Sequence, residues 1–402
     1  MGVFRLNVKI QNAFLSGVIN AIPSKSYAHR IAICNFFAGN NPDACCGSFT
    51  SNDITVTENC LRGLLKKVNV IDCGESGSTL RFMLPLCAVL GGEYTFIGHG
   101  KLMQRPNAEL FAVMREHGVE IEQDDCIKLK GKLTSGIYRI RGDISSQYVS
   151  GLLMALPTLD GDSEIVLTTP LVSAPYVEIT LEVLDKFGIE IIKKENGFKI
   201  KGNQVYKGNG SPEGDWSNSA FFLCAGAING NITVKGLNLS SKQGDKQIID
   251  VLKLAGANVE ISDCGITVKK SKLKAFTYDA KDCPDLVPIT AVLGAYADGV
   301  SVIKNVSRLK IKESDRIEST LAMLKSFGIK GDCDGENFTV YGGKPICGCA
   351  DTFNDHRLAM SSAILALGAE GVSEIIDAQS ANKSYPTFFE DYNSLGGKAN
   401  AI

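Results

Sequence analysis

The chain has 402 residues, 44% hydrophobic and 21% charged, which is long enough for two ordinary globular domains. Its 42 Lys and Arg residues against 44 Asp and Glu give a net charge of -2, so nothing favours a nucleic-acid surface. No apolar stretch reaches the roughly 18 residues of a membrane span. The start, MGVFRLNVKI, alternates like a strand and lacks the apolar core of a signal peptide.

The cysteines predict a reducing compartment. There are 13 of them, an odd number, and none forms a Cys-x-x-Cys pair. The closest sets, Cys45-Cys46 and Cys347-Gly-Cys349, have no His at zinc spacing. Others, such as Cys34, lie in apolar sequence, where Cys acts as a small hydrophobe. We therefore expect reduced thiols, no metal site and a cytoplasmic protein.

A unit of two helices recurs along the chain. A polar stretch of Ser, Asp and Gly precedes an apolar helix of small residues, which is followed by a Gly turn and a strand. The unit recurs at roughly 70 residues, with a shorter first copy, and reads as a βαβαββ repeat. The apolar helix follows, in chain order, SKS at 24–26, GST at 77–79, SSQ at 145–147, DWS at 215–217, PD at 284–285 and NDH at 354–356.

A second, amphipathic helix follows in each unit, and several copies continue into a strand, a turn and a strand, as in IEIIKKENGFKIKG. The six units divide into three plus three near GNGSP at 208–212, which is rich in turn residues. One α/β domain of tandem βαβ units remains the alternative. The second helices are DITVTENCLRGLL, PNAELFAVMREHG, PYVEITLEVLDKFG, DKQIIDVLKLAG, DRIESTLAMLKSFG and PTFFEDYNSLGG.

Cationic residues accompany the starts of these helices. A helix start presents unpaired N–H groups and a positive dipole end, which favours an anion. If the repeats share one orientation, several starts converge, and the pattern predicts an anionic ligand. Any one of these cations alone would be read as solvated surface charge. They are Lys25, Arg30, Arg81, Arg105, Lys312, Arg316, Arg357 and Lys383.

Five motifs in order resemble one known family. PSKSYAHR at 23–30 resembles the opening motif of the 5-enolpyruvylshikimate-3-phosphate synthases, and GSTLR at 77–81 resembles their G-T-x-x-R segment. SSQ at 145–147, KESDR at 312–316 and NDHR at 354–357 match the remaining hallmarks. The resemblance covers residues 8–389, and although each motif is weak alone, the ordered set on six repeats is specific.

The resemblance implies an α/β fold of two lobes, each of three βαβαββ repeats wrapped around buried parallel helices as an inside-out α/β barrel. Residues 1–22 and 214–402 would form the first lobe, and residues 23–213 the second. The active site would lie in the interlobe cleft, and we expect a monomer.

The reaction implied by the resemblance moves the enolpyruvyl group of phosphoenolpyruvate to the 5-hydroxyl of shikimate 3-phosphate. Phosphate leaves after a tetrahedral intermediate, and no metal or organic cofactor takes part. The partners would be these two small molecules, with no nucleic acid and no membrane. Two phosphates and two carboxylates would then give the cationic residues their role.

The binding residues are also implied by the resemblance. Hydroxyl groups suit a phosphate that needs neutral donors, and Arg binds carboxylate or phosphate with both arms of its fork. Shikimate 3-phosphate would contact Lys25, Ser26, Arg30, Ser145, Ser146, Gln147, Ser173, Tyr176, Asp285 and Lys312. Phosphoenolpyruvate would contact Lys25, Gly77, Arg105, Gln147, Arg316, Arg357 and Lys383.

Three residues match the family's catalytic positions. Asp285 would take the proton of the 5-hydroxyl, although a plain helix N-cap is the alternative. Glu313 would protonate the methylene carbon, although a first-turn helix carboxylate is the alternative. Lys25 would assist the leaving phosphate by proton or charge donation. His356 receives no catalytic step, because a lone His is more often structural.

The chain departs from the family's pattern at three positions. Glu75 stands where many members carry Asn, Phe82 where Pro is common, and Arg308 where some members have Asn. These changes put the local hydrogen bonding in doubt but not the class of reaction.

Two other functions compete with this reading. The sister enzyme transfers enolpyruvyl to UDP-N-acetylglucosamine, but it usually has Lys-Asn near its start and a reactive Cys on a loop. Here Lys25-Ser26 replaces the first feature, and residues 101–105 contain no Cys. A non-catalytic or RNA-acting repeat protein would be more basic and would not need Glu313 amid cations.

Binding of shikimate 3-phosphate should close the molecule. The matched residues come from both expected lobes, and facing cations repel each other until an anion binds. An anion that contacts both sets shifts the population towards a closed form. Small-angle scattering should show a smaller radius of gyration with saturating shikimate 3-phosphate. An unchanged radius, starting from an open apo form, would refute ligand-driven closure.

Overall fold

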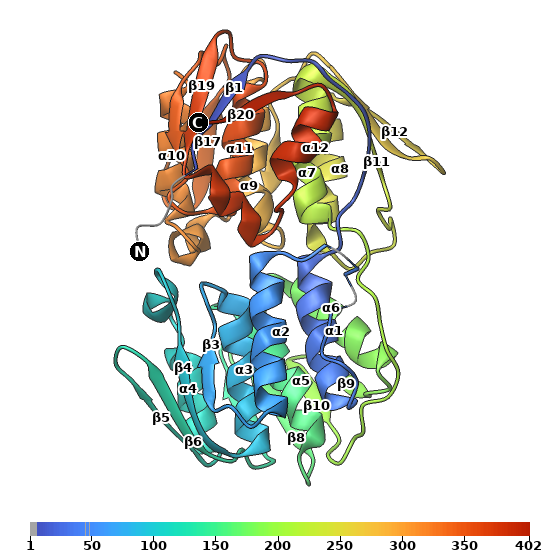
Figure 1. Ribbon diagram of the computed structural model, residues 1–402, viewed down its shortest axis with the longest axis vertical. Coiled ribbons are helices and arrows are strands. Elements are labelled where there is room, and N and C mark those ends of the chain that lie inside the picture. The colour runs from blue at the N-terminus through green and yellow to red at the C-terminus, as the bar shows by residue number, and fades with distance from the viewer. Residues whose placement is uncertain (1–5, 45, 48) are drawn as a thin grey trace. The chain divides into compact units, whose positions relative to one another are not determined.

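The computed structural model describes residues 6–44, 46–47 and 49–402. The chain forms two compact units, which are coloured along the sequence in Figure 1. The terminal unit joins Met1–Ile22 to Glu213–Ile402, and the central unit is Pro23–Pro212. The second crossing between the units therefore falls before residue 213, one residue ahead of the predicted boundary.

Two general features of the described residues bear on the sequence predictions. Their cysteines are all free thiols, while Cys45 of the adjacent pair lies outside the described part of the chain. None of the helices within those ranges is both long enough and apolar enough to cross a membrane.

Six helices are buried on nearly all sides and form the centres of the units. Their sequences are apolar all round, as in SAFFLCAGAI, and such helices must be covered on every face. In the terminal unit, three of them contact one another. They are α1 (Lys25–Phe37), α3 (Gly77–Leu90) and α5 (Ser146–Ala155) in the central unit, and α7 (Trp216–Asn229), α9 (Val287–Ala295) and α11 (His356–Ala366) in the terminal unit.

The amphipathic helices each bury one face. In α6, for example, Val177, Thr180 and Leu184 are buried while Glu178 and Lys186 are not. In the central unit, α2 packs between α1 and α3 (Figure 1). The set comprises α2 (Asn52–Leu65), α4 (Ala108–Glu116), α6 (Ala174–Lys186), α8 (Ile248–Leu254), α10 (Arg316–Ser326) and α12 (Phe388–Ser394).

The described strands form five four-stranded sheets with one common topology. In each sheet, a parallel pair is extended by two antiparallel strands, and the parallel pair needs a crossover helix. The central unit has two sheets. One contains β3 (Val70–Asp72), β4 (Gly92–Ile97), β6 (Ile127–Gly131) and β5 (Val119–Gln123); the other contains β7 (Ile137–Ile140), β8 (Ser163–Leu167), β10 (Gly197–Ile200) and β9 (Ile191–Lys194).

The terminal unit has three sheets, and two of them take a strand from the N-terminal segment. The first contains β12 (Asn258–Ser262), β13 (Gly265–Lys269), β11 (Gly230–Lys235) and β2 (Leu15–Asn20). The second contains β14 (Thr277–Asp279), β15 (Val300–Lys304), β17 (Asn337–Tyr341) and β16 (Gly331–Cys333). The third contains β18 (Cys349–Asp351), β19 (Val372–Ile376), β1 (Val8–Gln11) and β20 (Lys398–Ala401).

The first repeat is a helix pair. Between α1 and α2, the described residues form no strand. The intervening sequence, AGNNPDACCGSFTS, contains Gly, Pro and Asn and lacks an alternating apolar run, so it cannot build a half-buried strand. Within the described residues, the prediction of six βαβαββ repeats therefore holds for five, and the short first copy shows two helices without a sheet.

Short 3₁₀ segments stand at several helix starts and matter for the polar residues. Two of them, η3 and η4, directly precede α8 and α9. They are η1 (Leu102–Gln104), η2 (Leu156–Thr158), η3 (Gly244–Gln247), η4 (Pro284–Leu286), η5 (Ser307–Ile311) and η6 (Ala378–Lys383).

Candidate functional site

The terminal unit holds a buried guanidinium surrounded by carboxylates. Arg316, with a side chain 1% exposed, donates from Nε to Asp355 Oδ2 at 2.7 Å. Its Nη1 donates to Asp285 Oδ1 at 2.7 Å, and its Nη2 to Glu313 Oε2 at 2.8 Å. Because the guanidinium is planar and rigid, it fixes the orientation of Asp285 relative to Glu313.

Two further cations share Asp285. Arg357 Nη2 lies 3.1 Å from Asp285 Oδ2, and Lys312 Nζ lies 3.6 Å from Oδ1. Asp285 lies in η4, and Leu286 is the N-cap of α9, so the N-cap alternative for Asp285 is wrong. Asp285 instead places a carboxylate among three cations.

Helix starts position this set. Asp355 is the N-cap of α11, where Oδ1 accepts from Arg357 N at 2.9 Å while Oδ2 holds Arg316. Asp315 caps α10, so Glu313 precedes the helix, and the first-turn alternative for Glu313 is also wrong. We call these residues the charged cluster: Asp285, Lys312, Glu313, Arg316, Asp355 and Arg357.

Opposing effects set the proton affinities in the charged cluster. Burial alone would lower the pKa of Arg316, but Asp355, Glu313 and Asp285 together raise that pKa well above its ordinary value. The pKa of Lys312 is lowered, first by loss of hydration and then by positive Arg316, against the attraction of Asp285. Arg316 therefore stays charged, while Lys312 gives up its proton more readily than an exposed lysine.

The central unit contains a buried guanidinium with neutral partners. Arg30 donates from Nε to Thr180 Oγ1 at 2.6 Å, from Nη1 to Ser26 O at 2.6 Å, and from Nη2 to Tyr176 O at 2.9 Å. Burial lowers its pKa to about 10. Among the residues that the structure describes, no carboxylate pairs with Arg30. A buried cation that lacks a counter-charge favours an anionic ligand.

Lys25 begins α1 beside this guanidinium. Its Nζ lies 2.8 Å from Asp53 Oδ2 in the first turn of α2, and both side chains are mostly buried. The pair joins the starts of α1 and α2. Sequence reasoning gave Asp53 no role, although its place two residues after Ser51, the N-cap of α2, marks it as a carboxylate at a helix start.

Hydroxyl groups tie the start of α3 to the same helices. His29 Nδ1 lies 2.8 Å from Thr57 Oγ1, Thr57 Oγ1 lies 2.6 Å from Thr79 Oγ1, and Thr79 donates to Ser76 Oγ at 2.8 Å. The pKa of His29 is lowered well below its ordinary value by burial and then by Lys25 and Arg30. His29 is therefore a neutral structural residue that holds α1, α2 and α3 in register.

Gly77, the first residue of α3, lies directly against Arg105. A Cβ atom on residue 77 would stand 2.5 Å from Arg105 Nη1 and 2.9 Å from Cζ. Only glycine lets the guanidinium lie flat against the helix start. The predicted phosphoenolpyruvate residues Gly77 and Arg105 are thus in contact.

Arg81 connects Arg105's segment to α5. Its Nη1 donates to Gln147 Oε1 at 2.7 Å, its Nη2 to Pro106 O at 3.0 Å, and its Nε to Asn107 Oδ1 at 3.1 Å. Gln147 Nε2 in turn donates to Ser78 Oγ at 2.8 Å. Sequence reasoning placed Arg81 in a motif without a role, and the structure shows that it orients Gln147.

Ser145 and Ser146 form the start of α5. Ser145 is the N-cap, and its Oγ accepts from Gln147 N at 3.3 Å, while Ser146 is the first helical residue and is buried. Backbone N–H groups in this first turn have no partner within the helix, which makes the start of α5 suited to an anion.

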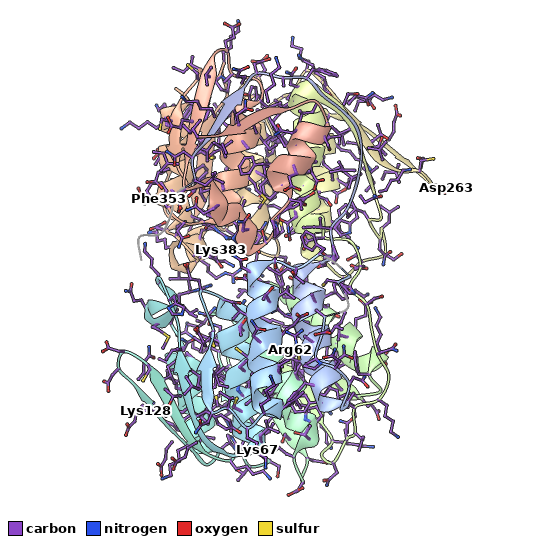
Figure 2. All side chains as sticks on the ribbon, viewed as in Figure 1. Arg62, Lys67, Lys128, Asp263, Phe353 and Lys383 are labelled. Atoms are coloured by element: carbon purple, nitrogen blue, oxygen red, sulfur yellow. The ribbon has the colours of Figure 1, made fainter. Side chains whose placement is uncertain are left out.

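Backbone strain occurs at or next to two further predicted residues, Ser173 and Lys383. Ser173 is buried and has φ 52°, and Phe353 and Asn354 have φ 51° and 57°. Non-glycine residues in this region are uncommon and cluster at functional sites. Lys383 Nζ donates to Asn354 O at 2.7 Å, which brings Lys383 to the segment that leads into Asp355 (Phe353 and Lys383 are labelled in Figure 2).

The three departures from the family's pattern have visible surroundings. The Arg30 guanidinium stacks over the Phe82 ring at 5.1 Å, an attractive cation–π contact. Arg308 Nη2 donates to Lys281 O at 3.0 Å. The Glu75 carboxylate packs against Gly100, where a Cβ atom would stand 2.9 Å from Oε2.

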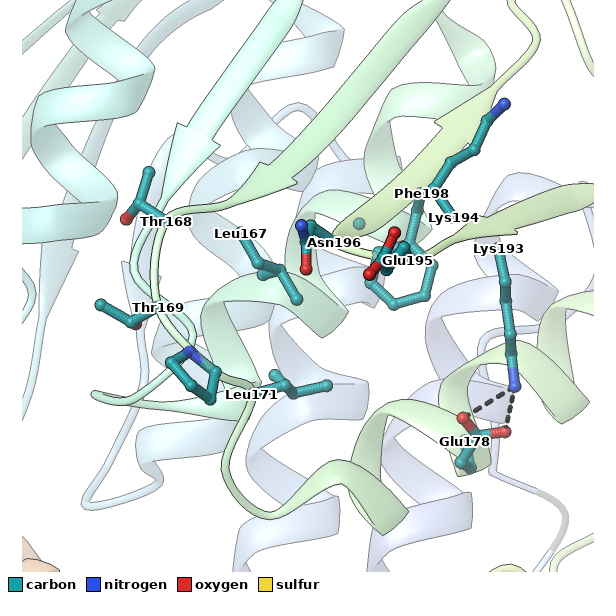
Figure 3. A pocket seen from close by; sticks show the side chains of 12 residues that line it. Leu167, Thr168, Thr169, Leu171, Glu178, Lys193, Lys194, Glu195, Asn196 and Phe198 are labelled. Atoms are coloured by element: carbon teal, nitrogen blue, oxygen red, sulfur yellow. Dashed lines mark hydrogen bonds and ion pairs between the residues drawn. The ribbon is translucent and has the colours of Figure 1, made fainter.

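One open pocket has none of the predicted site residues in its lining. It is lined by residues 167–171, Glu178 and residues 193–198 on the central unit (Figure 3). Glu178 and Lys193 close one side of it with an ion pair. In the described part of the chain, no group of three His, Cys, Asp or Glu side chains is arranged to hold a metal ion.

Comparison with known proteins identifies a family. A family model described as EPSP synthase (3-phosphoshikimate 1-carboxyvinyltransferase) matches residues 56–392. The 3-phosphoshikimate 1-carboxyvinyltransferase of Clostridium beijerinckii is 37% identical over 97% of this chain and 98% of its own. The protein of the same name from Methanococcus maripaludis is 35% identical over 96% and 98%.

Two solved structures share the fold. An EPSP synthase from Acinetobacter baumannii superposes with a TM-score of 0.79 and 21% identity, covering 99% of this chain and 100% of its own. The enolpyruvyl transferase NikO from Streptomyces tendae superposes with a TM-score of 0.74 and 16% identity, covering 99% of each chain. At these identities the likeness shows the arrangement of the chain and nothing finer.

Removing the central guanidinium should strongly destabilise the protein. Arg316→Met leaves three carboxylates without their shared counter-charge, and breaking a buried ion pair from one side costs about 3–5 kcal/mol. We expect a loss of this size in the free energy of unfolding, measured by urea denaturation at neutral pH. Because protonation relieves the remaining carboxylates, the loss should shrink at lower pH.

Lys269→Met is the control for this prediction. Lys269 pairs with Glu260 on the surface, where the two side chains are 41% and 55% exposed. Removing an exposed pair should cost less than about 1 kcal/mol. Equal losses from the two variants would contradict the central place of Arg316.

Proposed function

The chain belongs to the EPSP synthase family, and we propose that it is a 3-phosphoshikimate 1-carboxyvinyltransferase of the shikimate pathway. It would transfer the enolpyruvyl group of phosphoenolpyruvate to the 5-hydroxyl of shikimate 3-phosphate. The observation that carries the proposal is the single guanidinium of Arg316, which holds Asp285 and Glu313 together. One carboxylate can accept the proton of the hydroxyl, while the other carboxyl group can give a proton to the carbon.

The addition step needs a base and an acid at the same time. Asp285 would accept the proton of the 5-hydroxyl while the oxygen of that hydroxyl forms a bond to C2 of phosphoenolpyruvate. Glu313 would give a proton to the C3 methylene, which turns the double bond into a methyl group on a tetrahedral carbon. General acid–base catalysis requires such positioned groups.

The elimination step returns the double bond. The C2–phosphate bond breaks, phosphate leaves with its electron pair, and one methyl proton returns to Glu313. Lys25 would stabilise the leaving phosphate by charge or proton donation. Its ion pair with Asp53 holds the ammonium at the start of α1.

The acid role of Glu313 needs a change in its surroundings. Arg316 donates to Glu313 and so favours the ionised carboxylate in the structure. An anionic substrate that binds Arg316 would compete for this guanidinium. Weaker pairing would raise the proton affinity of Glu313 at the moment when a proton is required.

We carry the predicted binding residues over to the two ligands. We assign shikimate 3-phosphate to Lys25, Ser26, Arg30, Ser145, Ser146, Gln147, Ser173, Tyr176, Asp285 and Lys312. The uncompensated charge of Arg30 supports this assignment, because the ligand's phosphate would supply the counter-charge. We assign phosphoenolpyruvate to Lys25, Gly77, Arg105, Gln147, Arg316, Arg357 and Lys383, among which Gly77 touches Arg105.

The competing acceptor is not favoured. The curated relatives carry the name of the shikimate enzyme across nearly the whole chain. The cytoplasmic location and the monomeric state stay predictions, and the free thiols of the described cysteines support a reducing compartment.

A phosphate-release assay tests the proposed reaction. Purified protein is incubated with phosphoenolpyruvate and, in turn, with shikimate 3-phosphate or UDP-N-acetylglucosamine. We expect phosphate release with shikimate 3-phosphate alone. Release with the UDP-sugar but not with shikimate 3-phosphate would reject the proposal.

Glu313→Gln should nearly abolish turnover and leave ligand binding largely intact. The amide keeps the size of the side chain but has no transferable proton, and loss of general acid–base catalysis costs about 100- to 10,000-fold. The measurements are kcat and the affinity for shikimate 3-phosphate. Glu318→Gln, an exposed change on α10, is the control. Turnover of Glu313→Gln within a few-fold of wild type would show that Glu313 is not the acid.

Arg105→Ala should weaken phosphoenolpyruvate binding more than shikimate 3-phosphate binding. Losing a charge-assisted contact costs about 1.5–3 kcal/mol, or roughly ten- to a hundredfold in affinity. Gly77→Ala should have the same selective effect, because its Cβ atom would displace the Arg105 guanidinium. Arg139→Ala, on the exposed side of β7, is the charge-matched control. Equal weakening of both ligands would reject the assignment of Arg105.

A further inference from the structure

A buried carboxyl group outside the predicted site lies beside the charged cluster. Asp245, in η3, is 2% exposed. Its Oδ2 accepts from Ser217 Oγ at the start of α7. Its Oδ1 is buried and has no hydrogen-bond partner among the described residues. A buried polar atom without a partner is costly and asks for an explanation.

The charges around Asp245 come from several elements. Two of its neighbours, Tyr278 and Cys283, are neutral, because burial raises the pKa of each. The remaining neighbours are charged: Asp285 and Asp215 repel a negative Asp245, while Arg357 attracts it. These titratable and charged groups are Asp215 on the N-cap of α7, Tyr278 on β14, Cys283 and Asp285 at η4, and Arg357 on α11.

The surroundings favour a neutral carboxylic acid. Burial raises the pKa of Asp245 from 3.8 to about 7, and negative Asp285 adds to the increase, while Arg357 and the Ser217 hydroxyl oppose it. An ionised Asp245 would leave a buried charged oxygen without a donor. The geometry and the charges therefore agree that Asp245 carries a proton up to neutral pH.

We propose that Asp245 is a positioning residue that acts through Arg357. As a neutral acid, Asp245 does not attract the Arg357 guanidinium, which can then pair with Asp285 and with an incoming anion. Once ionised, it competes for Arg357 and adds negative charge beside the anion site. This inference rests on the proposed function, because it takes Arg357 as a contact of phosphoenolpyruvate.

Linkage makes the effect reciprocal. If an ionised Asp245 weakens anion binding, anion binding must raise the proton affinity of Asp245 by the same factor. A coupling of one pKa unit corresponds to about tenfold in affinity. The carboxyl group would thus take up a proton as the substrate binds.

The pH dependence of Asp245→Asn tests the role in catalysis. Asparagine has the shape of the neutral acid and cannot ionise. We measure kcat/KM for phosphoenolpyruvate from pH 6 to pH 8.5 and divide the variant's value by that of wild type. The ratio should rise about tenfold over this range as wild-type Asp245 ionises. Asp250→Asn, an exposed change on α8, should give a flat ratio.

The pH dependence of unfolding tests the proton itself, without substrates. The folded protein holds a proton on Asp245 up to about pH 7, whereas the unfolded chain releases it near 3.8. As the pH rises from 3.8 to about 7, the wild type therefore loses the part of its unfolding free energy that this proton contributes, and Asp245→Asn has no such loss. The difference in unfolding midpoint between the two proteins should be smallest near pH 4. From there to pH 7, the midpoint of Asp245→Asn should rise relative to that of the wild type.

The outcomes separate the two proposals. A flat kcat/KM ratio, or an equal loss at every pH, overturns the role of Asp245 and leaves the proposed function standing. An unfolding difference that does not change with pH overturns the neutral acid. Failure of the wild type to release phosphate with shikimate 3-phosphate at any pH refutes the proposed function and, with it, the role at Arg357.

Discussion

The burial of Arg316 constrains the terminal unit more than any other single interaction. Removing a guanidinium from water costs several kcal/mol, and in the terminal unit three well-placed carboxylates offset that cost. Asp355, Asp285 and Glu313 come from the starts of three different segments, so each start must reach the same point. The buried helices α9 and α11 and the outer helix α10 are thereby held in one register by charge as well as by packing.

The central unit handles its buried cation differently. Arg30 is held by hydroxyl and carbonyl oxygens and by the Phe82 ring, all of them neutral. These groups orient the guanidinium without cancelling its charge, so an anion can still be attracted to it. The Arg316 charge is matched within the protein and orients three carboxylates, whereas the Arg30 charge has no carboxylate partner among the described residues. Phe82, a departure from the family's pattern, contributes to this arrangement.

A repeated construction brings such residues together. The inner helices are apolar along most of their length and are buried, so a ligand can meet only the polar residues near their starts. The inner helices begin with polar residues that cap the helix and lie next to predicted site residues: Asp355 caps α11 and holds Arg316, and Ser145 caps α5 ahead of Gln147. Asp245 extends the same principle in our proposal: it is buried in an outer segment, it interacts electrostatically with Asp285 and Arg357, and its change of charge near neutral pH would act on the charged cluster.

The sequence alone determined the α/β class, the recurring helix pair and the family, because apolar periodicity and short motifs are local properties. The structure confirmed the helix pairs, and the comparisons confirmed the fold and the family. The roles of the site residues stay predictions. Only the tertiary structure decided that the described residues of the first repeat form no sheet, that Asp285 is no N-cap, and that Arg81 orients Gln147. Asp245 carried no signal in the sequence, since nothing in SKQGDKQ marks it as buried. Such contacts join residues far apart in the chain, as Arg357 and Asp285 are, and their distances and burial exist only after the helices have packed.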